Sequence, residues 1–147
     1  MISKTAQLKW NKKKAIPRAI PKHKRISRLK KQADLLFSEY IRKRDGKCMY
    51  CGKKENLQCS HVYGRRWEDG RWDCDNAITL CAGCHLYKWH SGEYQVQMHE
   101  WFMETFADEW SRISKKHGTI VKAKTEEELI EIRDNLKMKL NEVSHIS

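Results

Sequence analysis

Residues 48–90 read CMYCGKKENLQCSHVYGRRWEDGRWDCDNAITLCAGCHLYKWH, and this stretch organises the rest of the chain. It contains two C-x-x-C pairs, Cys48 with Cys51 and Cys81 with Cys84, and 29 residues separate the inner cysteines. Four thiolates in two close pairs are typical of a closed tetrahedral zinc site. The sequence therefore predicts a structural Zn²⁺ that clips a small domain together.

Residues that carry chemistry lie between and just after the two pairs. Residues 57–62 alternate as a short strand with His61 near its end, and residues 77–80 form an apolar second strand directly after Asn76. The second cysteine pair then turns the chain into a helix that carries His85. The predicted fold class is α+β, mostly helical, around a central ββα unit stapled by the zinc.

Two imidazoles placed in this way suit the hydrolysis of a phosphodiester. An imidazole at the end of a strand titrates near neutrality and can act as a general base, which is the role expected of His61. A second imidazole on the facing helix, His85, can bind a divalent ion that stabilises charge on the leaving oxygen. Asn76 is expected to bridge backbone groups and so to keep the two strands in position.

These residues resemble the HNH, or ββα-metal, nuclease family in its zinc-knuckle form. The residues that carry the resemblance are the two cysteine pairs, Ser60-His61, Asn76, and Leu80 and His85 on either side of the last pair. The resemblance implies that His61 is the general base, that Asn76 is structural and that His85 binds a catalytic Mg²⁺ or Mn²⁺. It also implies products with 5′-phosphate and 3′-hydroxyl ends.

Other, less specific segments of the sequence resemble the phage lambda NinG (Rap) recombination nuclease family. They cover roughly residues 30–143 and comprise residues 31–33, residues 41–45, Arg71-Trp72 shortly before Asn76, and the tail from Tyr94 through the helix after Thr125. This resemblance implies a phage-encoded protein in the cytoplasm of the host cell, with branched recombination intermediates as substrates.

The sequence departs from the HNH pattern at two positions. Ser60 stands where many members have an Asp or His ligand, and Trp89 stands where others have a second histidine on the helix. His90 comes one residue later, five after His85, and is about 140° away from it in a regular helix. His90 is therefore expected to reach the metal only if the helix ends or unwinds near Trp89.

The positive charge of the chain is concentrated at its beginning. The net charge is +11, yet residues 1–33 hold twelve Lys and Arg and no acidic residue, so the remainder is close to neutral. A basic arm over residues 1–26 predicts a polyanionic partner, here DNA, although such an arm can also be a solubilising tail. The candidate phosphate contacts are Lys12, Lys13 and Lys14 in the arm, Arg65, Arg66 and Arg71 in the loop between the strands, and Lys88.

No secretory signal follows Met1, and no apolar run approaches the length of a membrane span, so a soluble cytoplasmic protein without membrane contact is expected. In a reducing compartment the cysteines act as ligands rather than as disulfides. Cys59 alternates with its neighbours on the strand and is expected to be a small buried hydrophobe, whereas Cys74 has no evident role.

Three segments are predicted: the arm over 1–26, a helix over 27–45 that leads into the nuclease core up to residue 92, and a helical hairpin over 93–147. In the last segment an apolar stripe from Met98 to Ile113 indicates one long helix. Thr125 and Glu128 form a capping box that begins the final helix. The stripe can pack on the chain's own first helix or form an isologous interface with a second copy; a homodimer is favoured because cutting a junction on two strands needs two active centres and each chain supplies one.

The sequence as a whole favours a metal-dependent DNA endonuclease with a structural Zn²⁺ and a catalytic Mg²⁺ or Mn²⁺. Two alternatives remain. One is a sequence-specific HNH nuclease of the homing or restriction type, and the other is a zinc-stabilised DNA-binding module without catalysis.

Overall fold

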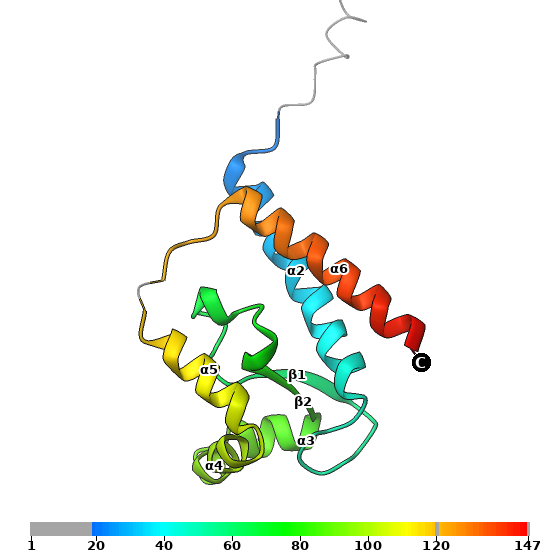
Figure 1. Ribbon diagram of the computed structural model, residues 1–147, viewed down its shortest axis with the longest axis vertical. Helices are drawn as coiled ribbons and strands as arrows, with labels where there is room; N and C mark the ends of the chain where they lie inside the picture. Colours follow the sequence, from blue (N-terminus) through cyan, green and yellow to red (C-terminus); the bar gives the residue numbers. More distant parts are fainter. Residues whose placement is uncertain (1–18, 120, 147) are drawn as a thin grey trace, which may run out of the picture.

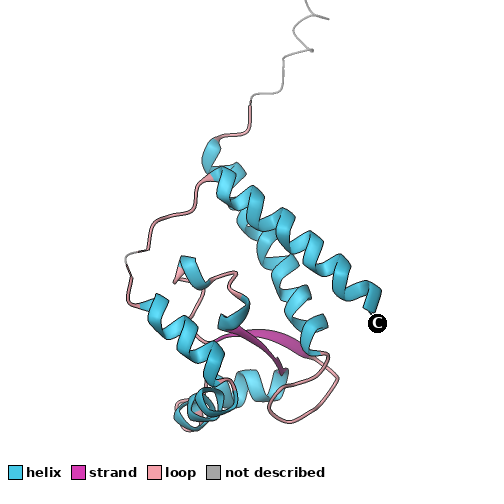
Figure 2. Cartoon of the chain, viewed as in Figure 1, coloured by secondary structure: helices cyan, strands magenta, loops and turns pink. Residues whose placement is uncertain are grey.

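The computed structural model describes residues 19–119 and 121–146 of the chain (Figures 1 and 2). Helices make up 64% of it, and the described part holds one sheet of two strands, so the predicted mostly helical α+β class is confirmed. Lys12, Lys13 and Lys14, predicted to contact DNA, lie outside the described residues. None of the described helices combines the length and the apolar character that crossing a membrane requires.

The first described helix, α2 (Lys22–Asp45), begins five residues before the predicted start and ends where predicted. Pro21 precedes it with φ −55°, and a fixed φ of this size lets the chain enter the helix directly. Residues 22–26, predicted to belong to the arm, are therefore helical. Gly46 ends the helix in the left-handed conformation, with φ 66°, which glycine adopts without strain.

The two strands, β1 (Leu57–His61) and β2 (Ala77–Cys81), pair antiparallel, and every residue of β2 is buried. Thr79 of β2 ties the sheet to α2. Its hydroxyl donates to the carbonyl of Ile41 at 3.1 Å, and its N–H donates to the carboxylate of Asp45 at 2.7 Å. The C-terminal half of α2 is thereby fixed across the sheet.

The connection between the strands contains two short 3₁₀ turns, η1 (Glu68–Gly70) and η2 (Cys74–Asn76). After β2 the chain makes one helical turn, α3 (Ala82–Cys84), and continues into a π-helical turn, η3 (His85–Trp89). The local order of strand, loop, strand and helix is the predicted one.

The single long helix predicted from the apolar stripe is wrong, because two helices stand there: α4 (Gln95–Thr105) and α5 (Ala107–His117). They separate at Phe106, whose φ and ψ are −120° and 50°. A straight helix would carry the end of the stripe away from the ββα unit, whereas the break brings Ile113 back to the core that contains Met98.

The last helix, α6 (Glu126–Ile146), begins at the predicted capping box. The Thr125 N–H donates to the Glu128 carboxylate at 2.7 Å, and the Glu128 N–H donates to the Thr125 hydroxyl at 3.2 Å. α6 packs along α2 and not against α4 and α5, so the structure differs from the predicted hairpin (Figure 1). Arg25 on α2 pairs with Glu126 at 2.8 Å and secures its first turn.

The apolar stripe of residues 98–113 is largely covered within the chain. Met98, Phe102 and Ile113 are at most 1% exposed and pack with Trp89 beneath the sheet. The helix α6 buries Leu136 in a second cluster with α2 and the start of β2. The most buried part of the stripe is thus packed within the chain, while Trp101, Phe106 and Trp110 are partly exposed, and the homodimer stays a prediction.

Candidate functional site

The four predicted zinc ligands, Cys48, Cys51, Cys81 and Cys84, come together at one end of the sheet. Their sulfur atoms lie within 4.8 Å of one another, and the Sγ atoms of Cys51 and Cys81 are 3.7 Å apart. A tetrahedral Zn²⁺ with bonds of about 2.3 Å places its sulfur ligands about 3.8 Å apart. The cluster therefore fits a structural metal such as zinc, which would join the loop after α2 to the end of β2.

The first cysteine pair is shaped by a tight turn. Gly52 has φ 79°, a value that glycine alone adopts easily, and its N–H donates to the carbonyl of Cys48 at 2.9 Å. Burial opposes ionisation of Cys48, but backbone N–H groups around its sulfur outweigh this and lower the pKa of the thiol to about 7. Donors arranged around a thiolate suit a metal ligand.

His61 stands half-buried at the end of β1. Its Nε2–H donates to the carbonyl of Arg71 at 2.8 Å, because a carbonyl can only accept, and Nδ1 therefore carries the lone pair. The Phe37 ring of α2 packs beside it, with 5.5 Å between ring centroids. Burial lowers the pKa of His61 below its ordinary value, and the nearby Arg65 acts in the same direction. The ring is neutral at pH 7 and able to accept a proton.

Asn76 bridges the connection between the strands as its position predicts. Its side chain is fully buried and makes three hydrogen bonds to the backbone. The Tyr63 N–H donates to Oδ1 at 2.8 Å, and Nδ2 donates to the carbonyls of Tyr63 and Gly70 at 2.9 and 2.8 Å. These bonds close the segment that follows His61, so Asn76 sets the shape of the loop and not the chemistry.

His85 and His90 meet because the turn between them is π-helical. The His90 N–H donates to the carbonyl of His85 at 3.2 Å, a bond that spans five residues, and the two Nε2 atoms lie 3.0 Å apart. Two ligands at right angles on an octahedral ion with bonds of about 2.1 Å are also about 3.0 Å apart. The pair therefore fits adjacent positions on a divalent ion. Trp89, four residues after His85, is buried and donates from Nε1 to the His61 carbonyl at 3.2 Å.

Gln58 is a site residue that the sequence reasoning missed. Its Oε1 accepts a hydrogen bond from the Nδ1–H of His85 at 2.6 Å. This contact leaves the lone pair of His85 on Nε2, the atom that faces His90. Gln58 shares a face of β1 with Ser60, and the strand pattern alone gives no sign of its contact with a histidine 27 residues later. Ser60 itself is fully buried and does not line the cleft described next.

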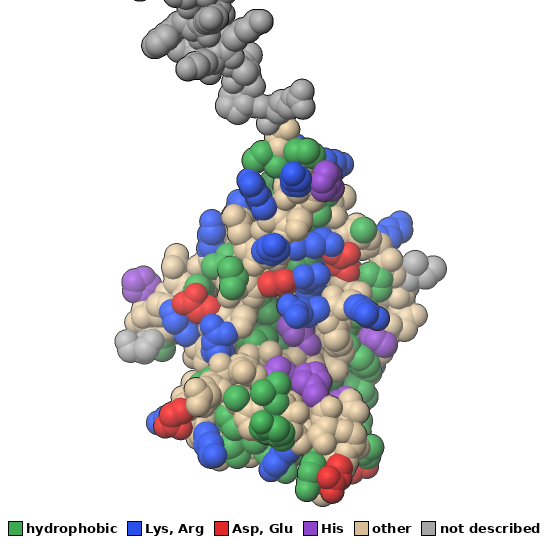
Figure 3. Space-filling view, turned by 180° about the vertical axis from the view of Figure 1, so that it is seen from behind, with side chains coloured by type: hydrophobic (Ala, Val, Ile, Leu, Met, Phe, Trp, Pro, Cys, Tyr) green, Lys and Arg blue, Asp and Glu red, His purple; other side chains and the backbone are tan. Residues whose placement is uncertain are grey.

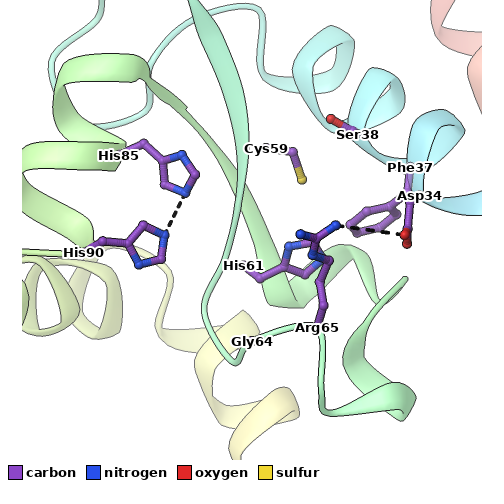
Figure 4. Close-up of a pocket in the computed structure, with 9 residues that line it drawn as sticks. All are labelled: Asp34, Phe37, Ser38, Cys59, His61, Gly64, Arg65, His85 and His90. Carbon is purple, nitrogen blue, oxygen red and sulfur yellow. Dashed lines mark hydrogen bonds and ion pairs between the residues drawn. The ribbon is translucent and has the colours of Figure 1, made fainter. Parts of the chain in front are cut away.

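A cleft of about 320 Å³ lies between α2 and the ββα unit, and His61, His85 and His90 line it together (Figure 4). His61 lies between the His85–His90 pair and the residues of α2. In the space-filling view, His side chains gather in the middle of one face of the molecule (Figure 3). Cys59 also lines the cleft, and burial raises the pKa of its thiol to about 12, so it remains a protonated apolar group as expected.

The residues predicted to contact phosphate differ in their exposure and in their partners within the chain. Arg71 is held in a two-point ion pair by Asp34 of α2, at 2.9 and 2.6 Å, and its guanidinium faces this partner. Trp72 donates to the same carboxylate at 3.0 Å. Asp34, also missed in the sequence, thus fixes the segment whose carbonyl holds His61. Arg65 is exposed at the rim of the cleft, 4.0 Å from Asp34. Arg66 is exposed as well, and Lys88 lies over the Tyr50 ring, 4.9 Å from its centroid.

Comparison with protein-family models, with curated proteins and with solved structures found no match for this chain. The case for a function therefore rests on the residues of the chain itself.

Proposed function

We propose that this chain is a metal-dependent DNA endonuclease that hydrolyses phosphodiester bonds. His61 would be the general base, and His85 and His90 would be ligands of a catalytic Mg²⁺ or Mn²⁺. The observation that supports this proposal most is the convergence of three imidazoles in one cleft, two of them with Nε2 atoms 3.0 Å apart. The resemblance to HNH nucleases supports the same assignment, and the NinG-like residues favour branched recombination intermediates as substrates.

The chemistry follows from the hydrogen bonds of the histidines. Because Nε2 of His61 is tied to the Arg71 carbonyl, Nδ1 is the atom that accepts a proton from the attacking water. The same carbonyl then stabilises the imidazolium that forms, since a hydrogen bond from a charged donor is stronger. A divalent ion held by His85 and His90 would supply stabilisation of charge on the leaving oxygen. The closed four-cysteine site has no open position and would serve the fold alone.

Contacts to the substrate backbone fall to the cations that are not neutralised within the cleft. Asp34 already balances the charge of Arg71, so Arg65 and Arg66 are the better candidates in the loop. Lys88 on η3 is the candidate beside the histidine pair, and Lys12, Lys13 and Lys14 would add affinity without selectivity.

The test is nicking of a supercoiled plasmid with Mg²⁺, with Mn²⁺ and with a chelator. We expect cleavage only with a divalent ion, and we expect His61→Ala to lower the rate by about 10²–10⁴-fold while DNA binding and thermal stability persist. His145→Ala, a change of the same type at an exposed position on α6, is the matched control and should cut normally. A His61→Ala protein that cuts at the wild-type rate would remove His61 from the mechanism.

The same assay separates the competing functions. Faster cleavage of a four-way junction than of a linear duplex supports a structure-selective nuclease. Discrete fragments from linear DNA would instead identify a sequence-specific nuclease of the homing or restriction type. DNA binding without any nicking would identify a zinc-stabilised binding module.

A further inference from the structure

A stripe of cations, exposed except for the half-buried Arg42, runs along the face of α2 that leads into the cleft. Lys24, Arg28 and Lys31 follow one another at spacings of four and three residues, and Arg42 continues the same face toward the C-terminal end. At about 100° per residue, all four lie within a sector of about 60°. We call Lys24, Arg28, Lys31 and Arg42 the α2 stripe.

Most basic residues of α2 outside the stripe have an acidic partner, and the members of the α2 stripe have none among the ion pairs of the described residues. Off the stripe, Arg25, Lys30, Lys43 and Arg44 each form an ion pair with a carboxylate. No such pair involves a member of the stripe in the part of the chain that the structure describes. Like charges at these spacings repel by about 0.2–0.5 kcal/mol per pair, and no acidic residue in the first turn of α2 offsets the repulsion. A bound polyanion would remove this repulsion.

The stripe is continuous with the candidate active site. Ser38 lies on the same face, lines the cleft, and accepts a hydrogen bond from the Arg42 guanidinium. α6 packs along a neighbouring side of α2, where Arg25 pairs with Glu126, and Lys24, Arg28 and Lys31 stay exposed beside it (Figure 1). The space-filling view shows Lys and Arg side chains gathered next to the surface histidines on one face (Figure 3).

We propose that the α2 stripe binds the phosphate backbone of duplex DNA and leads it into the cleft. From Lys24 to Arg42 the helix rises about 27 Å, at about 1.5 Å per residue. This length corresponds to about eight base pairs at about 3.4 Å each, so the stripe fits the side of a duplex arm next to the cut position. Leu35 interrupts the stripe with a side chain that is 72% exposed and adds no charge. The inference rests on the proposed function and deepens it by placing the duplex.

The test measures the affinity for a short duplex as a function of salt, in a His61→Ala background that leaves the DNA intact. Each phosphate contact contributes about −0.9 to the slope of log K against log salt. The triple variant Lys24→Gln, Arg28→Gln and Lys31→Gln should therefore flatten the slope by about 2.7. The control variant, Lys54→Gln with Lys115→Gln and Lys122→Gln, removes the same charge from exposed positions elsewhere and should leave the slope near that of the His61→Ala protein.

The outcomes distinguish this inference from the proposed function. If the wild-type protein binds and nicks DNA but the stripe variant keeps the slope of the His61→Ala protein, the duplex does not lie on α2 and the inference fails alone. If both triple variants flatten the slope equally, the effect is one of net charge and the inference also fails. A wild-type protein that neither binds nor nicks DNA overturns the proposed function. If the stripe variant flattens the salt slope for single-stranded DNA but not for duplex DNA, the assignment of a duplex arm to the stripe is overturned.

Discussion

Asn76→Ala is the change for which the structure gives the clearest quantitative expectation. It removes three hydrogen bonds from the segment between the strands and leaves two carbonyls and one N–H without their partner. The change touches neither the histidines nor the cysteines, so it tests the architecture of the site separately from its chemistry.

The expected loss of stability is about 4 kcal/mol. The bond to the Gly70 carbonyl is buried, and leaving such a group unpaired costs about 2 kcal/mol. The two bonds to Tyr63 are partly exposed, so water can replace part of each, and their loss costs about 1 kcal/mol apiece. Against a typical stability of about 5–15 kcal/mol, this is a large fraction.

The assay is urea unfolding followed by tryptophan fluorescence at a fixed concentration of free Zn²⁺. With a slope of about 2 kcal/mol per molar urea, the midpoint should fall by about 2 M. Asn135→Ala, the same substitution at an exposed position of α6, should move the midpoint very little. A loss below about 1 kcal/mol for Asn76→Ala would mean that the three bonds are not what holds the loop, and the reasoning would be refuted.

Three further predictions concern the metal sites and the general base. Cys81→Ser should release the one structural metal expected per chain and unfold the domain, because the free energy of metal binding contributes to the free energy of folding. Cys74→Ser should keep the metal, and elemental analysis with circular dichroism measures both results. Gln58→Leu should weaken Mn²⁺ binding by about 10–100-fold in calorimetry, because the Nδ1–H of His85 loses its acceptor, and Gln58→Glu should restore binding. Equal Mn²⁺ affinities of the wild-type and Gln58→Leu proteins would contradict the role of Gln58. Burial lowers the pKa of His61 and its neutral form is the base, so the acid limb of the nicking rate should have its midpoint below pH 6.5. A midpoint above 6.5 would contradict this assignment.

The parts of the fold that sequence reasoning predicted are those that depend on local spacing. The cysteine knuckles, the two strands and the capping box at Thr125 each need information from only a few neighbouring residues. The α+β class followed from them. The break at Phe106 could not be predicted in this way, since apolar periodicity continues through it and the break follows from packing on a core made by other segments.

The parts of the candidate site that were missed depend on partners far apart in the sequence. Asp34 meets Arg71 across 37 residues, and Gln58 meets His85 across 27. Nothing in the sequence around Arg71 indicates that a carboxylate of α2 neutralises it. Arg71 was therefore predicted to contact phosphate. The meeting of His85 and His90 was predicted only as a condition, and the π-helical turn fulfils it.

The π-helical turn of η3 also affects which sequence separation brings two metal-ligating histidines together. In this turn the backbone hydrogen bond joins residues five apart, whereas in a regular helix it joins residues four apart. One inserted residue therefore lengthens the segment and still leaves the residues at its two ends side by side. Tyr87, 75% exposed within the turn, shows that the extra length is accommodated at the surface. A search for histidines at a fixed separation of four passes over this pair. Ligand geometry can thus survive insertions and deletions that a sequence pattern of fixed length does not allow.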